Sequence, residues 1–267
     1  MSAPVLSVKN LTVKLQTGEI IVDDVSFNIN EGEIVVISGA NGCGKTTIIE
    51  TVFGLKKEGK YLLEGSVLFA DMGEILSSKV NQNVIQNFRK RIVFVSQRDD
   101  YESLGRTITM LKPFEDQAQN YSISQTITKK DVSNILKRYF PKTEGAPEIT
   151  VKTKPLNLSG GQQRLLSIIA PVIVRKDAEL FLIDEPLNNF DYDNMKRISD
   201  LINEIHRNNA KAAFLIITHC RIFPFVTKRI EMAKGKFICE SSDLECYNCV
   251  GTPNEYGFYD ECGCFES

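Results

Sequence analysis

The chain contains the run Gly39-Ala40-Asn41-Gly42-Cys43-Gly44-Lys45-Thr46-Thr47. The residues before it, Glu33–Ser38, are mostly apolar and predict a short buried strand, and those after it, Thr47–Phe53, predict a helix that ends at Gly54. A glycine-rich loop between a strand and a helix lets successive backbone N–H groups point inward and coordinate phosphate oxygens. All nine residues are therefore predicted to line a phosphate-binding loop.

Two side chains of this loop add specific chemistry. Lys45 brings a positive charge to the β- and γ-phosphates, and Thr46 offers a hydroxyl group to Mg²⁺. The helix that begins here adds the positive end of its dipole. We therefore expect ATP and Mg²⁺ to bind at this loop.

Composition and charge bound the class of protein. The chain has 267 residues, 42% of them hydrophobic and 25% charged, which is typical of a globular protein with one large or two small domains. Its 32 basic and 34 acidic residues give a formal charge of −2, so no generic surface for nucleic acid or anionic lipid is indicated. No direct nucleic-acid partner is expected.

The sequence gives no sign of a membrane span or a secretory signal. The longest apolar run, Leu165–Val174, includes Ser167 and Pro171 and is far shorter than the roughly 20 residues that a membrane helix needs. The first residues lack a basic segment followed by an apolar one. We expect a cytoplasmic protein.

The order of patterns predicts an α/β fold with an added antiparallel layer. Alternating residues at 6–13 and 19–30 predict an antiparallel β layer, and further strands are expected at 65–69 and 91–96. From about residue 102 to 156 the chain is polar, with a helix expected over Lys129–Tyr139, which indicates a helical subdomain. Strands at 180–183 and 212–218, with a helix at 193–207 between them, predict a βαβ unit.

Two carboxylates follow the strand Leu180–Ile183. Asp184 is expected to hold Mg²⁺ through water, because an acidic residue at the carboxyl end of a core strand lies near the phosphate loop. Glu185 is expected to act as a general base on the water that attacks the γ-phosphate, the alternative being an acidic residue of a surface turn.

Further motifs give the chain a clear resemblance to the ATP-binding cassette (ABC) ATPases, from about residue 4 to 240. Leu158–Gln162 reads LSGGQ, Gln97 follows a predicted strand, Asn188–Asp191 reads NNFD, and His219 follows Thr218. With the phosphate loop and Asp184-Glu185, these motifs stand in the order found in that family. The resemblance implies the ABC ATPase fold over residues 1–240, with a P-loop core, a mixed sheet, an antiparallel β layer and a helical subdomain at about 102–172.

The resemblance also implies a head-to-tail dimer, formed with a second copy or with another ABC ATPase. Each ATP would lie between the phosphate loop of one subunit and Ser159, Gly160, Gly161 and Gln162 of the other. Gln97 would contact Mg²⁺ and the attacking water, His219 would steady the γ-phosphate, and Asp191 would pass information between sites. The catalytic set is then Glu185, His219 and Gln97, and the Mg²⁺ set is Thr46, Gln97 and Asp184.

Some positions depart from the family pattern. Leu15 stands where an aromatic residue usually stacks on adenine, so selectivity for ATP over GTP stays open. Pro171 lies in the helix after LSGGQ and is expected to end or kink it. Cys43 and Cys220 are interpreted as tolerated small residues, with redox control as the alternative.

The last residues, 241–267, form a cysteine-rich tail. Cys246, Cys249, Cys262 and Cys264 make two close pairs, which suits a tetrahedral Zn²⁺ site that could fold a segment too small for its own core. The second pair has only one residue between its cysteines, so redox use, a disulfide or uncommitted cysteines stay open.

These features predict the ATP-hydrolysing subunit of an ABC transporter, peripheral at the inner face of the cell membrane. The channel would belong to a separate integral membrane subunit, because no span is predicted here. The alternative is a soluble ABC ATPase that acts as a switch in a nucleic-acid, ribosome, cluster-assembly or defence complex. The cysteine tail favours the alternative, whereas the single cassette and the lack of a basic stripe or a coiled-coil insertion oppose it.

Overall fold

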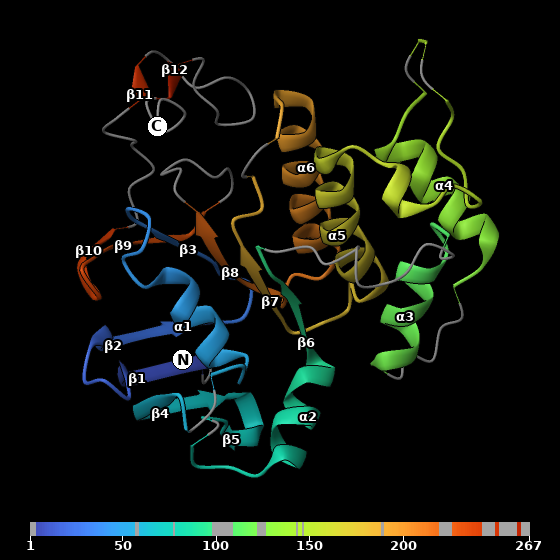
Figure 1. Cartoon of the computed structure of the whole chain (residues 1–267). Coiled ribbons are helices and arrows are strands. Elements are labelled where there is room, and N and C mark those ends of the chain that lie inside the picture. Colours follow the sequence, from blue (N-terminus) through green and yellow to red (C-terminus); the bar gives the residue numbers. More distant parts are fainter. Residues whose placement is uncertain are drawn as a thin grey trace.

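Two β-sheets form the body of the molecule (Figure 1). The computed structural model describes residues 4–56, 59–76, 78–97, 109–121, 127–142, 144–145, 147–187, 190–218, 226–241, 249–250 and 261–262. The antiparallel sheet contains, in spatial order, β2 (Ile20–Ile29), β1 (Leu6–Leu15), β4 (Tyr61–Phe69) and β5 (Gly73–Glu74). The larger sheet contains β10 (Lys236–Ser241), β9 (Lys228–Ala233), β3 (Ile34–Ser38), β8 (Ala213–Thr218), β7 (Leu180–Asp184) and β6 (Ile92–Val95). In the larger sheet only the β9–β10 pair is antiparallel, so the sheet is mixed.

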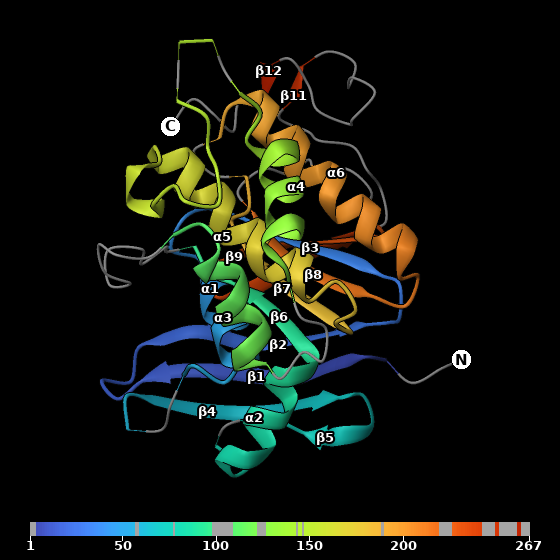
Figure 2. The ribbon, with the colours of Figure 1, turned by 90° about the vertical axis from the view of Figure 1, so that its right-hand side faces the viewer.

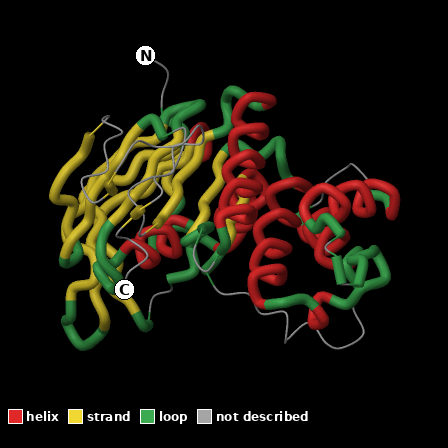
Figure 3. Tube along the Cα trace, turned by 90° about the horizontal axis from the view of Figure 1, so that it is seen from above, coloured by secondary structure: helices red, strands yellow, loops and turns green. Residues whose placement is uncertain are grey.

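The helices cover the larger sheet on both faces (Figures 1 and 2). Helix α1 (Lys45–Val52) lies between the two sheets, and α5 (Gly160–Val174) and α6 (Tyr192–Asn208) cover the opposite face. Viewed from above in Figure 3, the strands gather on one side and the helical region on the other. The remaining elements are α2 (Gln82–Arg91), α3 (Lys112–Asn120), α4 (Lys129–Tyr139), the 3₁₀ turns η1 (Ala70–Met72) and η2 (Pro155–Asn157), and the short strands β11 (Cys249–Val250) and β12 (Glu261–Cys262). Among the helices that the structure describes, none is both long and apolar enough to cross a membrane.

Strict alternation along the central strands divides the interior into two cores. In β3, Val35 and Ile37 face α1 and the antiparallel sheet, whereas Ile34 and Val36 face α5 and α6. Strands β7 and β8 follow the same rule. Because both faces are covered, these strands are apolar up to their last residues, Ser38, Asp184 and Thr218, as is typical of buried parallel strands. The mixed α/β fold and its antiparallel layer are confirmed, while the division into residues 1–240 and 241–267 stays a prediction.

Of the two outcomes expected at Pro171, an end or a kink of the helix, the end is wrong. Helix α5 continues through Pro171 to Val174. The proline lies near the end of the helix, so its missing N–H group costs one late hydrogen bond, and its ring is buried in the core. Its carbonyl oxygen accepts a hydrogen bond from the backbone N–H of Arg175 at 3.0 Å, which closes the helix.

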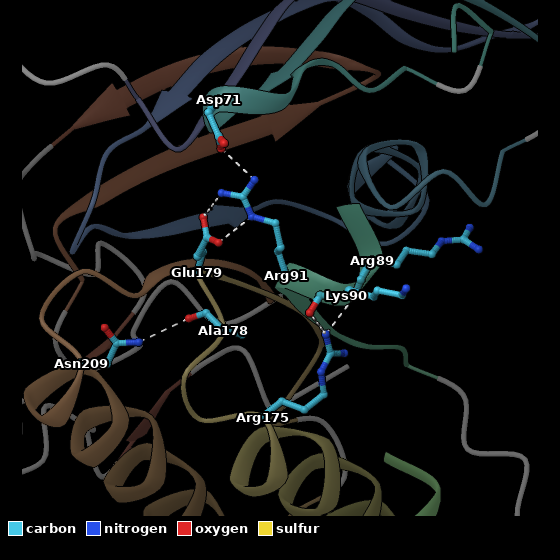
Figure 4. Close-up of polar contacts among 8 residues, drawn as sticks. All are labelled: Asp71, Arg89, Lys90, Arg91, Arg175, Ala178, Glu179 and Asn209. Atoms are coloured by element: carbon cyan, nitrogen blue, oxygen red, sulfur yellow. Dashed lines mark hydrogen bonds and ion pairs between the residues drawn. The ribbon is translucent and has the colours of Figure 1, made fainter. Parts of the chain in front are cut away.

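Two arginines connect the elements at the base of the larger sheet (Figure 4). Arg91, at the end of α2, forms a bidentate pair with Glu179 at 2.6 and 2.7 Å and an ion pair with Asp71 at 2.7 Å. Arg175 donates hydrogen bonds to the carbonyl oxygens of Arg89 and Lys90, at 2.8 and 3.2 Å. These contacts join α2 to the strand β7 and to the end of α5.

Candidate functional site

Parallel strands bring the predicted motifs to one edge of the larger sheet. The phosphate loop follows β3, Gln97 follows β6, and Glu185 follows β7, whose last residue is Asp184. The carboxyl ends of neighbouring parallel strands lie side by side, which is where ligands bind in α/β sheets. His219 follows β8 in the sequence but lies outside the described residues.

The phosphate loop needs glycine at two tight positions. A Cβ atom on Gly39 would lie 2.1 Å from the carbonyl oxygen of Met232, and one on Gly44 would lie 2.6 Å from that of Ile21. Their φ angles, 149° and 111°, are in the region that favours glycine. Strands β9 and β2 therefore hold the loop from two sides.

Lys45 is buried within the loop, with 5% of its surface exposed. Its ammonium group donates hydrogen bonds to the carbonyl oxygens of Gly39 and Ala40, at 2.7 and 3.0 Å, and lies 4.0 Å from the Sγ atom of Cys43. These contacts hold the charge inside the loop, where an arriving phosphate group would meet it.

Thr46 and Asp184 place two oxygen atoms together although they are far apart in the sequence. The hydroxyl group of Thr46 donates to Oδ1 of Asp184 at 3.3 Å. Burial raises the pKa of Asp184 above its ordinary value, an effect that the hydrogen bond from Thr46 and the charges of Arg164 and Lys45 partly oppose. A hydroxyl and a buried carboxylate are the hard oxygen donors that suit Mg²⁺, so these residues fit the predicted ion.

Glu185 has a backbone conformation that is uncommon for a residue with a side chain. Its φ angle is 51°, and its side chain is 4% exposed. Such a conformation costs on the order of 1–3 kcal/mol and persists only where neighbouring contacts fix it. Here the N–H group of Glu185 donates to the carbonyl oxygen of Ile217 at 2.8 Å, and its own carbonyl accepts from Arg164 at 3.0 Å.

A cavity of ≈ 180 Å³ joins these parts. Gln97 and Glu185 line it. The remaining described lining residues are Ile21, Asn41, Gly42, Gly44, Lys45, Thr46 and Thr47. Of the predicted loop residues, Gly39, Ala40 and Cys43 build the loop without being among those that line this cavity.

The LSGGQ residues lie elsewhere, at the start of α5. Ser159 and Gly160 are exposed, and Gly161 and Gln162 are half-buried. The hydroxyl group of Ser159 accepts from the N–H of Gln162 at 3.3 Å, and the Gln162 side chain accepts from the N–H of Ser159 at 3.0 Å. None of the LSGGQ residues is among the described residues that line the cavity beside the phosphate loop.

Of the remaining residues predicted from the sequence, some are placed by the structure and others lie outside the described residues. Asp191 is exposed and caps α6, where its carboxylate accepts from the N–H of Asn194 at 2.8 Å. Asn188, Asn189, Cys220, Cys246 and Cys264 lie outside the described residues. Cys249 and Cys262 are opposite each other on β11 and β12. Within the described part of the chain, no group of three or more His, Cys, Asp or Glu residues is arranged to hold a metal ion.

One cavity residue was missed from the sequence. Leu15, aligned with the usual adenine-stacking position, is half-buried and is not among the described residues that line the cavity, whereas Ile21 is. The carbonyl oxygen of Ile21 also lies against Gly44. No local pattern marks Ile21, because its position depends on the pairing of β2 beside the loop.

Comparison with known proteins agrees with this geometry. The model of the family described as "ABC transporter" matches residues 22–188. The energy-coupling factor transporter ATP-binding protein EcfA1 of Mycoplasma mycoides is 30% identical over 74% of this chain and 43% of its own length. The corresponding EcfA2 protein of Methanospirillum hungatei is 27% identical over 92% of this chain and 57% of its own length. The chain thus spans about half the length of these relatives.

Solved structures share the fold at low sequence identity. A dimeric ATP-binding cassette in a post-hydrolysis state with ADP and phosphate has a TM-score of 0.70 at 24% identity, covering 91% of this chain and 100% of that one. The protein cbiO1 of Clostridium perfringens, part of an ABC transporter complex, has a TM-score of 0.66 at 21% identity, covering 90% and 89%. Together with the order of the motifs and the cavity lined by the phosphate loop, Gln97 and Glu185, the family match establishes that this chain belongs to the ABC transporter family and has the fold of its ATP-binding cassettes.

Proposed function

We propose that this chain binds and hydrolyses ATP to power transport through a separate integral membrane subunit. The observation that carries the proposal is the convergence of Lys45, Thr46, Gln97 and Glu185 on one cavity, with Asp184 against Thr46. The names of the relatives, which are ATP-binding proteins of energy-coupling factor transporters, support the coupling to transport.

Each residue at the cavity has a task in this proposal. Lys45 and the loop N–H groups bind the phosphates, and Thr46, Gln97 and Asp184 hold Mg²⁺, which neutralises charge on the β- and γ-phosphates when bound. Glu185 accepts a proton from water as the water oxygen attacks the γ-phosphorus. The bond from that phosphorus to the bridging oxygen breaks, leaving ADP and inorganic phosphate. His219 contacts the γ-phosphate.

The site is proposed to be completed by a second subunit, either another copy or a second ABC ATPase. Ser159, Gly160, Gly161 and Gln162 of that subunit would bind the γ-phosphate of the ATP held by Lys45. Ser159 and Gly160 are exposed at the start of α5, and none of the four residues lines the cavity of its own chain, which supports this arrangement. Asp191 would pass information between the two sites.

Glu185→Gln tests the chemical step. We expect ATP to bind normally and kcat to fall by about 10²–10⁴, because general-base catalysis contributes about that factor. Light scattering after size exclusion in Mg²⁺-ATP should show a dimer. Glu64→Gln, at an exposed glutamate of β4, should behave as wild type. A monomeric Glu185→Gln protein in Mg²⁺-ATP would contradict the proposal.

The partner is tested by purification from the native membrane. We expect the chain to sit at the cytoplasmic face and to copurify with an integral membrane protein. Recovery only with soluble nucleic-acid or ribosomal components would favour the alternative, a soluble ABC ATPase that acts as a switch.

For the tail we propose that Cys246, Cys249, Cys262 and Cys264 hold one zinc ion. The opposed backbone positions of Cys249 and Cys262 on β11 and β12 support the proposal, because they bring one member of each cysteine pair together. Protein purified under reducing conditions without chelator should carry about one zinc per chain. A metal-free preparation would reject the site and favour redox use or uncommitted cysteines.

A further inference from the structure

Arg164, in the second turn of α5, contacts the catalytic edge of its own chain. Its side chain is 8% exposed. Its Nη1 atom donates to the carbonyl oxygen of Ser96 at 2.5 Å. Its Nη2 atom donates to the carbonyl oxygens of Asp184 and Glu185, at 2.8 and 3.0 Å. One guanidinium group thus binds backbone from two strand ends.

Both of these backbone segments lead into the cavity. Ser96 precedes Gln97, and Glu185 has the strained φ angle of 51°. The carbonyl groups of Asp184 and Glu185 belong to the peptide groups before and after the Cα atom of Glu185, so the two bonds restrict rotation about the φ and ψ bonds of Glu185. A planar guanidinium can donate in two directions at once, whereas the single ammonium group of lysine cannot span both strand ends.

We propose that Arg164 is a positioning residue, which holds the backbone of Ser96 and of Asp184-Glu185 in the geometry needed for hydrolysis. Arg164 is not among the described residues that line the cavity, and it would act through Gln97 and Glu185, which are. Arg164 also belongs to the helix that Ser159 caps. The helix that offers the LSGGQ residues to the neighbouring subunit therefore also binds the backbone of Glu185 in its own chain. This inference rests on the proposed ATPase function.

The test is Arg164→Lys, which keeps the positive charge but removes the planar guanidinium group that donates to both strand ends. We expect kcat for Mg²⁺-ATP hydrolysis to fall about tenfold to a hundredfold, because displacements near 1 Å in a catalytic site cost up to that factor. The Kd for ATP should stay within about twofold of wild type, since the phosphate loop around Lys45 does not include Arg164. A residue needed only for folding would not divide kcat from Kd in this way.

Arg175→Lys is the matched control. Arg175 lies at the other end of the same helix, is 3% exposed, and also donates to two backbone carbonyls, those of Arg89 and Lys90 (Figure 4). This variant should lose thermal stability to a similar degree and keep the wild-type kcat. A loss of activity caused by general destabilisation would appear in both variants, and this outcome would overturn the proposal.

Amide hydrogen exchange measures how firmly the backbone of these segments is held, and it does not depend on ATP hydrolysis. Amides in peptides covering 92–97 and 180–187 should exchange faster in Arg164→Lys than in wild type, because the amide of Glu185 bonds to the carbonyl oxygen of Ile217 only in the fixed geometry. In Arg175→Lys their exchange rates should equal those of wild type. Unchanged exchange at both segments, or a wild-type kcat in Arg164→Lys, would overturn the proposal. A wild-type protein that fails to hydrolyse ATP would refute the proposed function instead, and the exchange result would still decide the role of Arg164.

Discussion

Helices α1 and α5 both begin at a predicted phosphate-binding motif, but their first turns differ. Helix α1 follows Gly44, which has no side chain to cap it and has a φ angle of 111°. Helix α5 follows Ser159, which forms a reciprocal capping box with Gln162. The first turn of α1 therefore leaves its N–H groups for an external acceptor, whereas α5 satisfies part of its own.

This difference indicates a division of work between the two ends. An uncapped helix start beside a buried ammonium group is preorganised for an anion, so α1 should bind nucleotide within a single chain. At α5 the Ser159 oxygen already accepts a hydrogen bond, and its hydroxyl proton stays free to be donated to a phosphate oxygen. The α5 end should contribute only when a second subunit brings a nucleotide to it.

The largest expected effect on nucleotide binding comes from removing the charge of Lys45 at α1. Lys45→Ala should weaken ATP binding about tenfold to a hundredfold, because a hydrogen bond to a charged group contributes about 1.5–3 kcal/mol. Titration with a fluorescent ATP analogue measures this directly. Lys236→Ala changes a lysine that is 64% exposed and should bind ATP as the wild type does. Equal affinity of the Lys45 variant would mean that α1 is not the primary site.

A smaller effect on binding, with a clear effect on hydrolysis, is expected at α5. Ser159→Ala should leave ATP affinity of the single chain unchanged and lower hydrolysis about tenfold or more, since one charge-assisted hydrogen bond at closure is lost. Parallel measurements of Kd, kcat and ATP-dependent dimerisation separate these quantities.

The loss of a helix cap must be separated from the loss of a phosphate contact. Thr128 forms the same kind of capping box with Asp131 at the start of α4, outside the site. Ser159→Ala and Thr128→Ala should each lower stability by about 0.5–2 kcal/mol, but only the former should lower hydrolysis. If both variants keep the wild-type kcat, the LSGGQ edge has no role in turnover.

The sequence predicts those elements whose local pattern matches their environment. Helix α4 has the bounds expected from Thr128 at its start and Pro141 after its end. Strand β9 was missed, because three of its six residues are charged, and it is a strand only through pairing with β3 and β10. Helix α2 was missed because only three of its ten residues, Val84, Ile85 and Phe88, are apolar.

The same distinction applies to the site. The phosphate loop is contiguous, so its chemistry can be interpreted from the sequence alone. The contact of Thr46 with Asp184 joins residues 138 positions apart and requires the order of β3, β8 and β7 in the sheet. Arg164 could not be identified, because it binds backbone carbonyls that carry no side-chain signature.

The smallest expected effect concerns the buried carboxylate beside the first turn of α1. Burial raises the pKa of Asp184, so its contribution to stability is full below its ordinary pKa near 3.8 and is lost as the pH rises through the raised value. The ionised form of this group therefore opposes folding of the nucleotide-free chain. Asp184→Asn keeps an oxygen acceptor for Thr46 without the charge, and should melt about 2–4 °C higher, equivalent to roughly 1 kcal/mol.

Calorimetry as a function of pH and ligand decides this last prediction. The difference between Asp184→Asn and wild type should shrink as the pH falls toward 4, because the wild-type carboxyl group then becomes neutral too. Adding Mg²⁺-ATP should reverse the order, since the charge that costs stability in the empty site is the one that holds the ion. Asp200→Asn, at an exposed aspartate of α6, should have the melting temperature of wild type at each pH, with and without Mg²⁺-ATP. If the wild-type protein without nucleotide melts at a higher temperature than Asp184→Asn, this prediction is wrong. Lys45 and Arg164 would then already compensate the charge of the carboxylate, and the empty site would have no unbalanced charge for a cation to neutralise.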